Sequence, residues 1–273
     1  MSAEQQILLV GFGNMGQALV RGWLAKGRSA ATIRIVDSVA AARVVAAELG
    51  MAASATVADA VRGTRADVVL LAVKPNQLGA VLGECRASVA AGAVFLSIAA
   101  GKTIAQLVAG LGEQAAVVRA MPNTPAAIGQ GMTALVANAA VTAAQRALCS
   151  ELLVAVGAVA WLTEERHMDA VTAVSGSGPA YVFLLVECLE QAGLELGLDG
   201  PLARQLALTT VAGAGAYAAH ADVEPAELRR RVTSPNGTTQ AALNVLMGEP
   251  GLRELLQKAV RAAAERSREL SAA

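Results

Sequence analysis

The stretch that most constrains the fold of this chain is residues 7–16, ILLVGFGNMG. Its leading apolar residues predict a short strand that is buried on both faces of a parallel sheet. Gly11, Gly13 and Gly16 follow with the spacing G-x-G-x-x-G. In this spacing the first glycine permits a tight turn, the second lets a pyrophosphate approach the backbone, and the third lets a helix pack on the strand. The helix predicted to begin near Asn14 points its free N–H groups at such a phosphate.

A second apolar stretch, residues 33–36, leads into Asp37, which follows Gly16 by 21 positions. An acidic residue about 20 positions after the motif is expected to bind a ribose hydroxyl of a dinucleotide. A glycine-rich turn without a ligand is the alternative for the glycine motif alone. The complete unit of strand, helix, strand and acidic residue favours a dinucleotide-binding site.

Strands and helices are predicted to alternate as far as residue 162. Buried strands are expected near 67–73, 93–98 and 116–120, and shorter ones near 51–54, 133–137 and 156–162. Beyond residue 167 only helices are predicted, at 178–197, 201–220, 225–231, 239–247 and 251–270. This order predicts a doubly wound sheet, that is an α/β Rossmann dinucleotide-binding domain, over 1–164, followed by an all-α domain over 165–273.

The composition excludes several kinds of partner. Lys and Arg together number 22, as do Asp and Glu, so the net charge gives no reason to expect binding to nucleic acid or to an anionic membrane. Cys85, Cys149 and Cys188 lie far apart, and with only 2 histidines no metal-ligand spacing occurs. The first residues, MSAEQQ, contain no targeting signal, and the uncharged run 120–145 is interrupted by proline and glycine. We therefore expect a soluble cytoplasmic protein without a metal ion.

The chain is rich in small apolar side chains and poor in aromatic ones. Hydrophobic residues make up 55% of the chain but aromatic residues only 3%, which favours closely packed helices and large interfaces between helices. Residues 205–221 contain few charges, and a monomer would expose their apolar face. We therefore expect an obligate homodimer that forms through residues beyond 164.

Three further loops are predicted to follow strands, at the edge of the sheet where ligands of such folds bind. The first is Ala72-Val73-Lys74-Pro75, although a solvated surface lysine explains Lys74 equally well. The second, residues 97–103, ends in Gly-Lys-Thr, but Leu96 stands where a P-loop needs glycine, so no nucleoside triphosphate site is expected. The third, residues 120–125, contains two prolines and the polar pair Asn123 and Thr124.

Two stretches rich in glycine and hydroxyl residues, 175–180 and 234–239, open predicted helices. Helix capping by Ser and Thr is the simple explanation for both. In the second stretch, Pro235 and then Asn236-Gly237 predict a turn that tolerates positive φ. Thr238 is predicted to cap the helix that follows, whose free N–H groups suit a carboxylate.

The motifs GFGNMG, AVKP, SIAAG, AMPNTPA, AVSGSGPAY and RRVTSPNGTT occur in this order and cover nearly the whole chain. Together they resemble those of pyrroline-5-carboxylate reductase. The resemblance implies that NAD(P)H reduces the C=N bond of 1-pyrroline-5-carboxylate to L-proline, the last step of proline biosynthesis. It also implies a Rossmann domain and a helical dimerisation domain in which helices of two subunits interleave, with dimers often assembled into rings.

The loops and the resemblance together give an expected site. The cofactor, NADP or NAD, is expected to contact Gly11, Phe12, Gly13, Asn14, Met15, Gly16, Asp37, Ser38, Ala72, Val73, Lys74, Pro75, Ala99, Pro122 and Asn123. The substrate is expected to contact Ser234, Asn236, Gly237, Thr238 and Thr239, with N–H groups of Gly237 and Thr238 on its carboxylate. Thr239 is the expected catalytic residue, its hydroxyl on the ring nitrogen. A pyrroline imine is substantially protonated near neutral pH, so positioning of the reactants is expected to supply most of the barrier reduction.

The sequence departs from the family pattern in three places. Asn236-Gly237 replaces a frequent Gly-Gly, and Asp222 replaces a frequent Glu. Asp37-Ser38 stands where many members carry small or basic residues for the 2′-phosphate of NADPH. The choice between NADPH and NADH therefore stays open.

Two other functions fit part of the sequence. One is a two-domain dehydrogenase of the hydroxyacid-dehydrogenase type, which the absence of a lysine from residues 175–191 disfavours. The other is a non-catalytic dinucleotide sensor, which would have no use for the threonine-rich helix start at 238–239.

Overall fold

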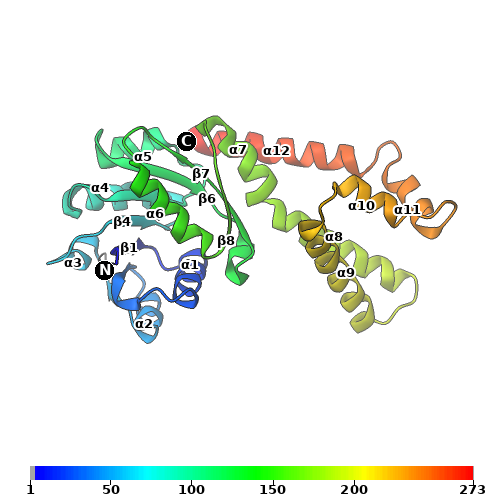
Figure 1. The fold of residues 1–273 in the computed structure, drawn as a ribbon, viewed down its shortest axis with the longest axis horizontal. Coiled ribbons are helices and arrows are strands. Elements are labelled where there is room, and N and C mark those ends of the chain that lie inside the picture. The colour runs from blue at the N-terminus through cyan, green and yellow to red at the C-terminus, as the bar shows by residue number, and fades with distance from the viewer. Residues whose placement is uncertain (1–3, 273) are drawn as a thin grey trace. The chain divides into compact units, whose positions relative to one another are not determined.

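The computed structural model describes residues 4–272 of the chain. They form two compact units (Figure 1). The sheet unit extends to Gly176 and also includes the end of the chain from Ala264, whereas the helical unit consists of Ser177–Ala263.

The sheet unit contains an eight-stranded sheet in the order β3-β2-β1-β4-β5-β6-β7-β8. The strands are β1 (Ile7–Val10), β2 (Ile33–Val36), β3 (Ala52–Ser54), β4 (Val68–Leu71), β5 (Val94–Ser97), β6 (Ala116–Met121), β7 (Gly131–Ala137) and β8 (Gly157–Trp161). Every neighbouring pair is parallel except β6 and β7. The strand order reverses between β1 and β4, which is where dinucleotides bind in doubly wound folds. The predicted Rossmann fold is confirmed.

Helices cover both faces of this sheet (Figure 1). They are α1 (Asn14–Ala25), α2 (Ala40–Glu48), α3 (Val57–Ala60), α4 (Leu78–Ser88), α5 (Ile104–Leu111) and α6 (Ala143–Val154), followed by the short α7 (Met168–Val171). Successive residues of β1 serve the two faces in turn: Leu9 packs in the same core cluster as Trp23, and Leu8 in the same cluster as Leu82. Because both faces are covered, β1 is apolar at every position, as predicted.

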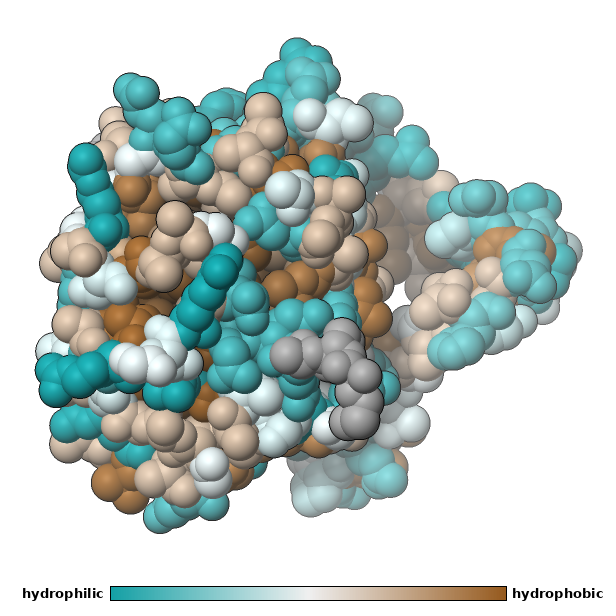
Figure 2. Space-filling view, turned by 60° about the vertical axis from the view of Figure 1, so that its left-hand side comes forward, coloured by the Kyte–Doolittle hydropathy of each residue, from teal (hydrophilic) through white to brown (hydrophobic). Residues whose placement is uncertain are grey.

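Polar and apolar side chains are also separated at the surface of the sheet unit. Figure 2 shows long hydrophilic side chains that project outward, with hydrophobic residues lying deeper between them. Most of the large apolar residues of β1, β2, β4 and β5 are fully buried. The face of the sheet unit that Figure 2 shows is thus an ordinary globular surface.

The helical unit contains no strand in its described residues. It consists of α8 (Gly178–Glu195), α9 (Gly200–His220), α10 (Pro225–Arg231), α11 (Thr238–Leu246) and the larger part of α12 (Leu252–Ala272). The predicted all-α second part is confirmed.

The chain passes between the units later than the expected domain boundary at residue 164. The strands do end at Trp161, but α7 and a π turn at Thr172–Gly176 still belong to the sheet unit. The last turns of α12 also return to it, because Ser267 Oγ donates to Asp169 Oδ1 at 2.6 Å and Gln106 Nε2 donates to the Ser271 carbonyl at 3.1 Å. Such long-range packing leaves no mark in the local sequence.

The helices α8 and α9 bury little of their apolar surface. No residue of α8 is buried, and in α9 only Ala203 and Ala207 are. Phe183 and Leu184 are 59% and 58% exposed. Exposed apolar surface of this extent is typical of an interface.

One helical segment of the described chain, Glu165–Glu195, is long and apolar enough to cross a membrane by length and composition. A single helix of this kind is weak evidence for a membrane, because helices of soluble proteins pass the same test. The apolar side chains of this segment suit a helix–helix interface equally well.

Candidate active site

The β1–α1 turn has the geometry that its glycines predict. Gly11 has a φ of +97°, and a Cβ there would lie 2.7 Å from the Ala72 carbonyl. A Cβ on Gly16 would lie 2.6 Å from the Gly11 carbonyl oxygen. By contrast, a Cβ on Gly13 would meet no atom within 4 Å, so the space in front of this residue is open. The first and third glycines therefore allow close packing, and the second leaves room for a ligand.

The N-terminus of α1 has the features of an anion-binding site. Its N-cap residue is Gly13, which has no side chain to accept a hydrogen bond from the first turn. No acidic residue occupies that first turn. The helix thus directs unpaired N–H groups and the positive end of its dipole at the open space before Gly13.

A cavity of about 370 Å³ lies at the carboxyl ends of β1, β2 and β4. It brings together many of the residues predicted to bind the cofactor. It is lined by Val10, Gly11, Gly13, Val36, Asp37, Ser38, Val39, Ala55, Ala72, Val73, Lys74, Gln77, Val81 and Glu84. The other predicted cofactor residues do not line this cavity: they are Phe12, Asn14, Met15, Gly16, Pro75, Ala99, Pro122 and Asn123.

Asp37 joins two loops at this cavity. Its Oδ2 accepts a hydrogen bond from the Phe12 N–H at 2.7 Å, and its Oδ1 accepts one from the Val39 N–H at 2.8 Å. Each carboxylate oxygen has a further lone pair, so Asp37 can still accept from a ribose hydroxyl. The sequence predicted the ribose contact but gave no sign of this bridging role. Phe12 itself is buried in the core and reaches the site only through its backbone.

A cation lies beside the same loop. Arg43 Nη1 donates to the carbonyl oxygens of Asp37 and Ser38, at 2.7 and 2.9 Å. Arg34, the second residue of β2, donates instead to the Ala60 carbonyl at 3.3 Å. Arg43 is therefore the guanidinium positioned next to the ribose edge of the cavity.

The β4 and β5 loops differ in exposure. Lys74 and Pro75 are exposed, and Lys74 lines the cavity. Ala99 is buried, and its N–H donates to Ser97 Oγ at 3.3 Å. The lysine is thus free to move toward a bound ligand, whereas Ala99 belongs to a fixed turn.

The loop after β6 is fixed by its asparagine. Asn123 Nδ2 donates to the carbonyl oxygen and to Oγ of Ser175, both at 3.2 Å, and Asn123 Oδ1 accepts from the Met132 N–H at 2.8 Å. Pro122 beside it is buried. The amide of Asn123 is therefore bound to the protein at both ends, which the sequence did not reveal.

In the helical unit, the stretch 234–239 forms the predicted turn. Asn236 has a φ of 59°, and the Gly237 N–H donates to the Ser234 carbonyl at 3.1 Å. This hydrogen bond uses the Gly237 N–H that was expected on the substrate carboxylate. The helix α11 begins at Thr238, and its N-cap is Gly237, without a side-chain cap.

The prediction that Thr238 caps this helix is wrong. A cap residue has extended backbone angles, which Gly237 has here (φ −84°, ψ 174°), so Thr238 becomes the first helical residue. Because no side chain caps α11, the N–H groups of its first turn, from Thr238 onward, have no helical partner. Ser234, Asn236, Thr238 and Thr239 thus belong to the turn and the first helical residues of α11, where free N–H groups are of the kind that binds a carboxylate.

A buried arginine near the sheet edge escaped prediction. Arg119 on β6 is 5% exposed, and its Nη1 donates to Glu165 Oε1 at 2.8 Å. The same oxygen accepts from the Ile104 N–H at the start of α5, also at 2.8 Å. A charged residue inside the apolar strand 116–121 was the available signal, because buried charges are normally paired.

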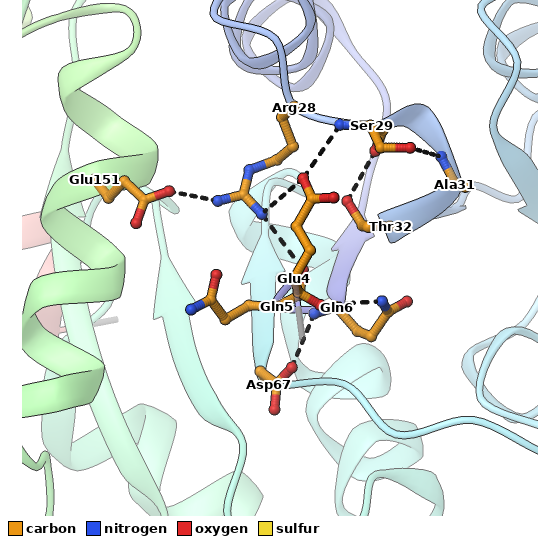
Figure 3. Close-up of polar contacts among 9 residues, drawn as sticks. All are labelled: Glu4, Gln5, Gln6, Arg28, Ser29, Ala31, Thr32, Asp67 and Glu151. Atoms are coloured by element: carbon orange, nitrogen blue, oxygen red, sulfur yellow. Dashed lines mark hydrogen bonds and ion pairs between the residues drawn. The ribbon is translucent and has the colours of Figure 1, made fainter. Parts of the chain in front are cut away.

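A second polar cluster lies at the opposite end of the sheet, around the residues that precede β1 and β4 (Figure 3). Arg28 forms ion pairs with Glu151 at 2.5 Å and Glu4 at 3.9 Å, and the Gln6 N–H donates to Asp67 Oδ2 at 2.8 Å. Figure 3 shows the guanidinium pointing toward both carboxylates. The hydrogen bond from Gln6 to Asp67 joins the residue before β1 to the residue before β4.

Among residues 4–272, no group of three or more His, Cys, Asp or Glu side chains is arranged to hold a metal ion. Cys85 and Cys149 are buried, and Cys188 is exposed.

Comparison with known proteins gives a consistent assignment for both units. The family model for pyrroline-5-carboxylate reductase dimerisation matches residues 165–270. The model described as NADP oxidoreductase, coenzyme F420-dependent, matches residues 6–101.

Similar whole proteins belong to one family. A pyrroline-5-carboxylate reductase from Pseudomonas aeruginosa is 46% identical over 267 residues, which is 97% of each chain. The structure of a pyrroline-5-carboxylate reductase from Coxiella burnetii has a TM-score of 0.92 and 37% identity, and covers 98% of each chain. The structure of Plasmodium falciparum pyrroline carboxylate reductase with NADP bound has a TM-score of 0.85 and 26% identity over 98% of each chain. Since this similarity runs through both units, the chain belongs to the pyrroline-5-carboxylate reductase family.

Proposed function

We propose that this chain is an NAD(P)H-dependent oxidoreductase that reduces the C=N bond of 1-pyrroline-5-carboxylate to L-proline, the last step of proline biosynthesis. The observation that carries the proposal is the similarity to pyrroline-5-carboxylate reductases over 97% of the chain, which includes both the β1–α1 turn and the start of α11. Neither a hydroxyacid dehydrogenase nor a dinucleotide sensor accounts for similarity over that whole length.

The residues around the cavity fit a nicotinamide dinucleotide. The open space before Gly13 and the uncapped N-terminus of α1 suit a pyrophosphate. Asp37, Ser38 and Lys74 line the cavity, which supports assigning Asp37 and Ser38 to the adenosine ribose and Lys74 to the phosphate or the ribose. The loops at Ala99 and at 122–123 then form the nicotinamide end. When bound, this cofactor supplies the hydride.

The start of α11 supplies the substrate contacts in this proposal. N–H groups from Thr238 onward take the carboxylate, assisted by Ser234 and Asn236, whereas the Gly237 N–H serves the turn itself. The Thr239 hydroxyl contacts the ring nitrogen. Since the imine is protonated to a large extent near neutral pH, its carbon accepts hydride without a strong general acid. The work of the protein is to hold both reactants in line.

Three finer points also belong to the proposal. The exposed apolar surface of α8 and α9, together with the match to a dimerisation model, supports a homodimer or a ring of dimers. That match begins at residue 165, which supports 1–164 and 165–273 as the division between family domains, whereas the compact units divide at Gly176. The protein is proposed to be cytoplasmic, with no nucleic acid, membrane or metal partner.

The test is an assay of the purified full chain with 1-pyrroline-5-carboxylate and either NADPH or NADH. Oxidation of the cofactor and formation of proline in equal amounts would support the proposal. Turnover of 2-hydroxy acids with the oxidised cofactor, but not of the pyrroline, would replace it with the hydroxyacid-dehydrogenase alternative. Tight cofactor binding without turnover of either substrate would support the alternative that the protein is a non-catalytic dinucleotide sensor.

A further inference from the structure

The chain leaves the sheet unit through an unusual piece of helix. The helical turns from α7 to α8 are interrupted by the π turn Thr172–Gly176, and the sheet unit ends at Gly176. We call residues 172–176 the π junction. The π-helix is rare and occurs mostly as a single turn within an α-helix, frequently at a functional site.

Asn123 supplies such contacts from the loop that follows β6. Its Nδ2 group donates twice to Ser175 of the π junction, once to the carbonyl oxygen and once to Oγ, each at 3.2 Å. Its Oδ1 accepts the Met132 N–H of β7 at 2.8 Å. A backbone N–H can only donate and a carbonyl oxygen can only accept, so the orientation of this amide is fixed by its partners.

Met121, two residues before Asn123, packs on the same turn. A Cβ placed on Gly176 would lie 2.5 Å from Met121 Cε, which shows how closely Met121 covers the π junction. Within the junction, Thr172 Oγ1 donates to the Met168 carbonyl at 2.9 Å. Met121 and Asn123 thus hold the junction from one side, and both stand at the carboxyl edge of the sheet, where the cofactor cavity opens.

We propose that Asn123 is a positioning residue for the reaction: its amide fixes the π junction to the loop at the nicotinamide end of the cofactor site. This inference rests on the proposed function, because it concerns the alignment of cofactor and substrate. Because both ends of its amide are bound to Ser175 and Met132, Asn123 contributes to the nicotinamide end by fixing the loop and not by a side-chain contact with the cofactor. Loss of its hydrogen bonds should therefore misalign the reactants without removing a cofactor contact, and small misplacements reduce turnover strongly.

The same pair of strands provides a matched control. Asn138 follows β7 as Asn123 follows β6, and its amide forms a similar bridge: Oδ1 accepts the Val117 N–H at 3.1 Å, and Nδ2 donates to the Ala115 carbonyl at 2.8 Å. This second bridge lies at the amino end of β6, at the opposite edge of the sheet from the cofactor cavity. Both asparagines are partly buried. Asn138→Ala therefore removes a comparable set of hydrogen bonds away from the site.

The experiment compares the full-length Asn123→Ala and Asn138→Ala variants with the unmodified chain. Three quantities are measured: kcat with saturating substrates, the Kd of NADPH in the absence of pyrroline, and hydrogen exchange of residues 172–180. For Asn123→Ala we expect kcat to fall about tenfold or more, the Kd to change less than about threefold, and exchange at the π junction to accelerate. For Asn138→Ala we expect kcat within about twofold of the unmodified chain and unchanged exchange at the junction.

Several outcomes would overturn the inference. If Asn123→Ala keeps the kcat of the unmodified chain, or if hydrogen exchange at the π junction is unchanged, the Asn123 amide does not position the junction for the reaction. A rise in the Kd of NADPH with an unchanged kcat would make Asn123 a direct cofactor contact instead. An equal loss of kcat in both variants would reduce its role to general stability.

A milder variant keeps the test decisive if Asn123→Ala does not fold. Ser175→Ala removes only the hydroxyl acceptor and leaves the carbonyl, so we expect the same pattern with a loss of kcat of about two- to fivefold. Full activity of Ser175→Ala, with unchanged exchange, would count against the inference. Absence of turnover in the unmodified chain would contradict the proposed function, whereas the exchange measurement still decides whether Asn123 holds the junction.

Discussion

Arg119 and Glu165 form a largely buried ion pair in which Nη1 of the arginine donates to Oε1 of the glutamate at 2.8 Å. The arginine side chain is only 6% exposed and the glutamate side chain 29%. The pair joins a central strand to the segment that leads into the helices. Because Glu165 Oε1 also accepts the Ile104 N–H, one oxygen serves two elements of the sheet unit.

Breaking this pair from one side should destabilise the protein. Glu165→Gln leaves the Arg119 guanidinium buried without a counter-charge, and we expect the free energy of unfolding to fall by about 2–3 kcal/mol, less than for a fully buried pair because the glutamate is partly exposed. Urea unfolding measures the change. Adding Arg119→Met should recover part of the loss. A double variant as unstable as the sum of the single changes would contradict the coupling.

The cofactor preference should depend on Arg43 and Asp37 in opposite ways. Arg43, next to Ser38, can pair with a 2′-phosphate, so Arg43→Met should lower kcat/KM for NADPH about tenfold and change it little for NADH. Asp37→Asn removes a charge that repels the phosphate, so it should raise the ratio of NADPH to NADH use by about five- to thirtyfold. Steady-state kinetics with both cofactors measures these ratios. Equal effects on the two cofactors would mean that neither residue faces the ribose.

The hydroxyl of Thr239 should matter for catalysis and that of its neighbour should not. Thr239→Val keeps the branched shape, and we expect kcat/KM to fall about 10–100-fold with little change in Tm. Thr238 is the first helical residue and caps nothing, so Thr238→Val should change the stability by less than about 0.5 kcal/mol. Kinetics and thermal melts of both variants test this. Full activity of Thr239→Val would remove the hydroxyl from the mechanism.

The exposed apolar helices should hold two copies of the chain together. Phe183 on α8 is 59% exposed, and Phe183→Glu would place a charge in the proposed interface. We expect the unmodified chain to sediment as a dimer or larger species, and the variant to dissociate or lose activity at low concentration. A stable, active monomer of the unmodified chain at micromolar concentration would contradict this.

Two buried thiols should make stability depend on alkaline pH. Burial, with a smaller effect of the Glu84 charge, raises the pKa of Cys85 to about 12, and burial raises the pKa of Cys149 to about 12. The unfolded chain releases these protons near pH 9, so the folded chain binds more protons between about pH 9 and 12 and loses stability as the pH rises through this range. Urea unfolding at increasing pH measures the trend. A Cys85→Ala, Cys149→Ala variant should show a weaker dependence, and an identical one would contradict the assignment.

The local pattern predicted the parts of the fold that depend on neighbours in sequence. The turn at Gly11, the switch to helix at Asn14 and the acid at Asp37 follow from spacing alone. The antiparallel direction of β7 also has a local cause, since the connection from Met121 to Gly131 is too short for a parallel crossover.

The parts that escaped prediction depend on contacts between distant residues. Nothing near Asn123 in sequence indicates that its partner is Ser175, and nothing near Ser267 indicates Asp169. At the start of α11 the threonines suggested a cap, but the strained turn at Asn236 places Gly237 at that position. The sequence therefore indicated which loops line the cavity better than it indicated which contacts hold the loops in place.

The return of α12 to the sheet unit makes the helical unit an insertion within the sequence of the sheet unit. The chain passes from one unit to the other twice, after Gly176 and after Ala263. A truncation after Gly176 would therefore remove, together with the helical unit, the residues from Ala264 onward that belong to the sheet unit. No single cut of the chain separates the two units.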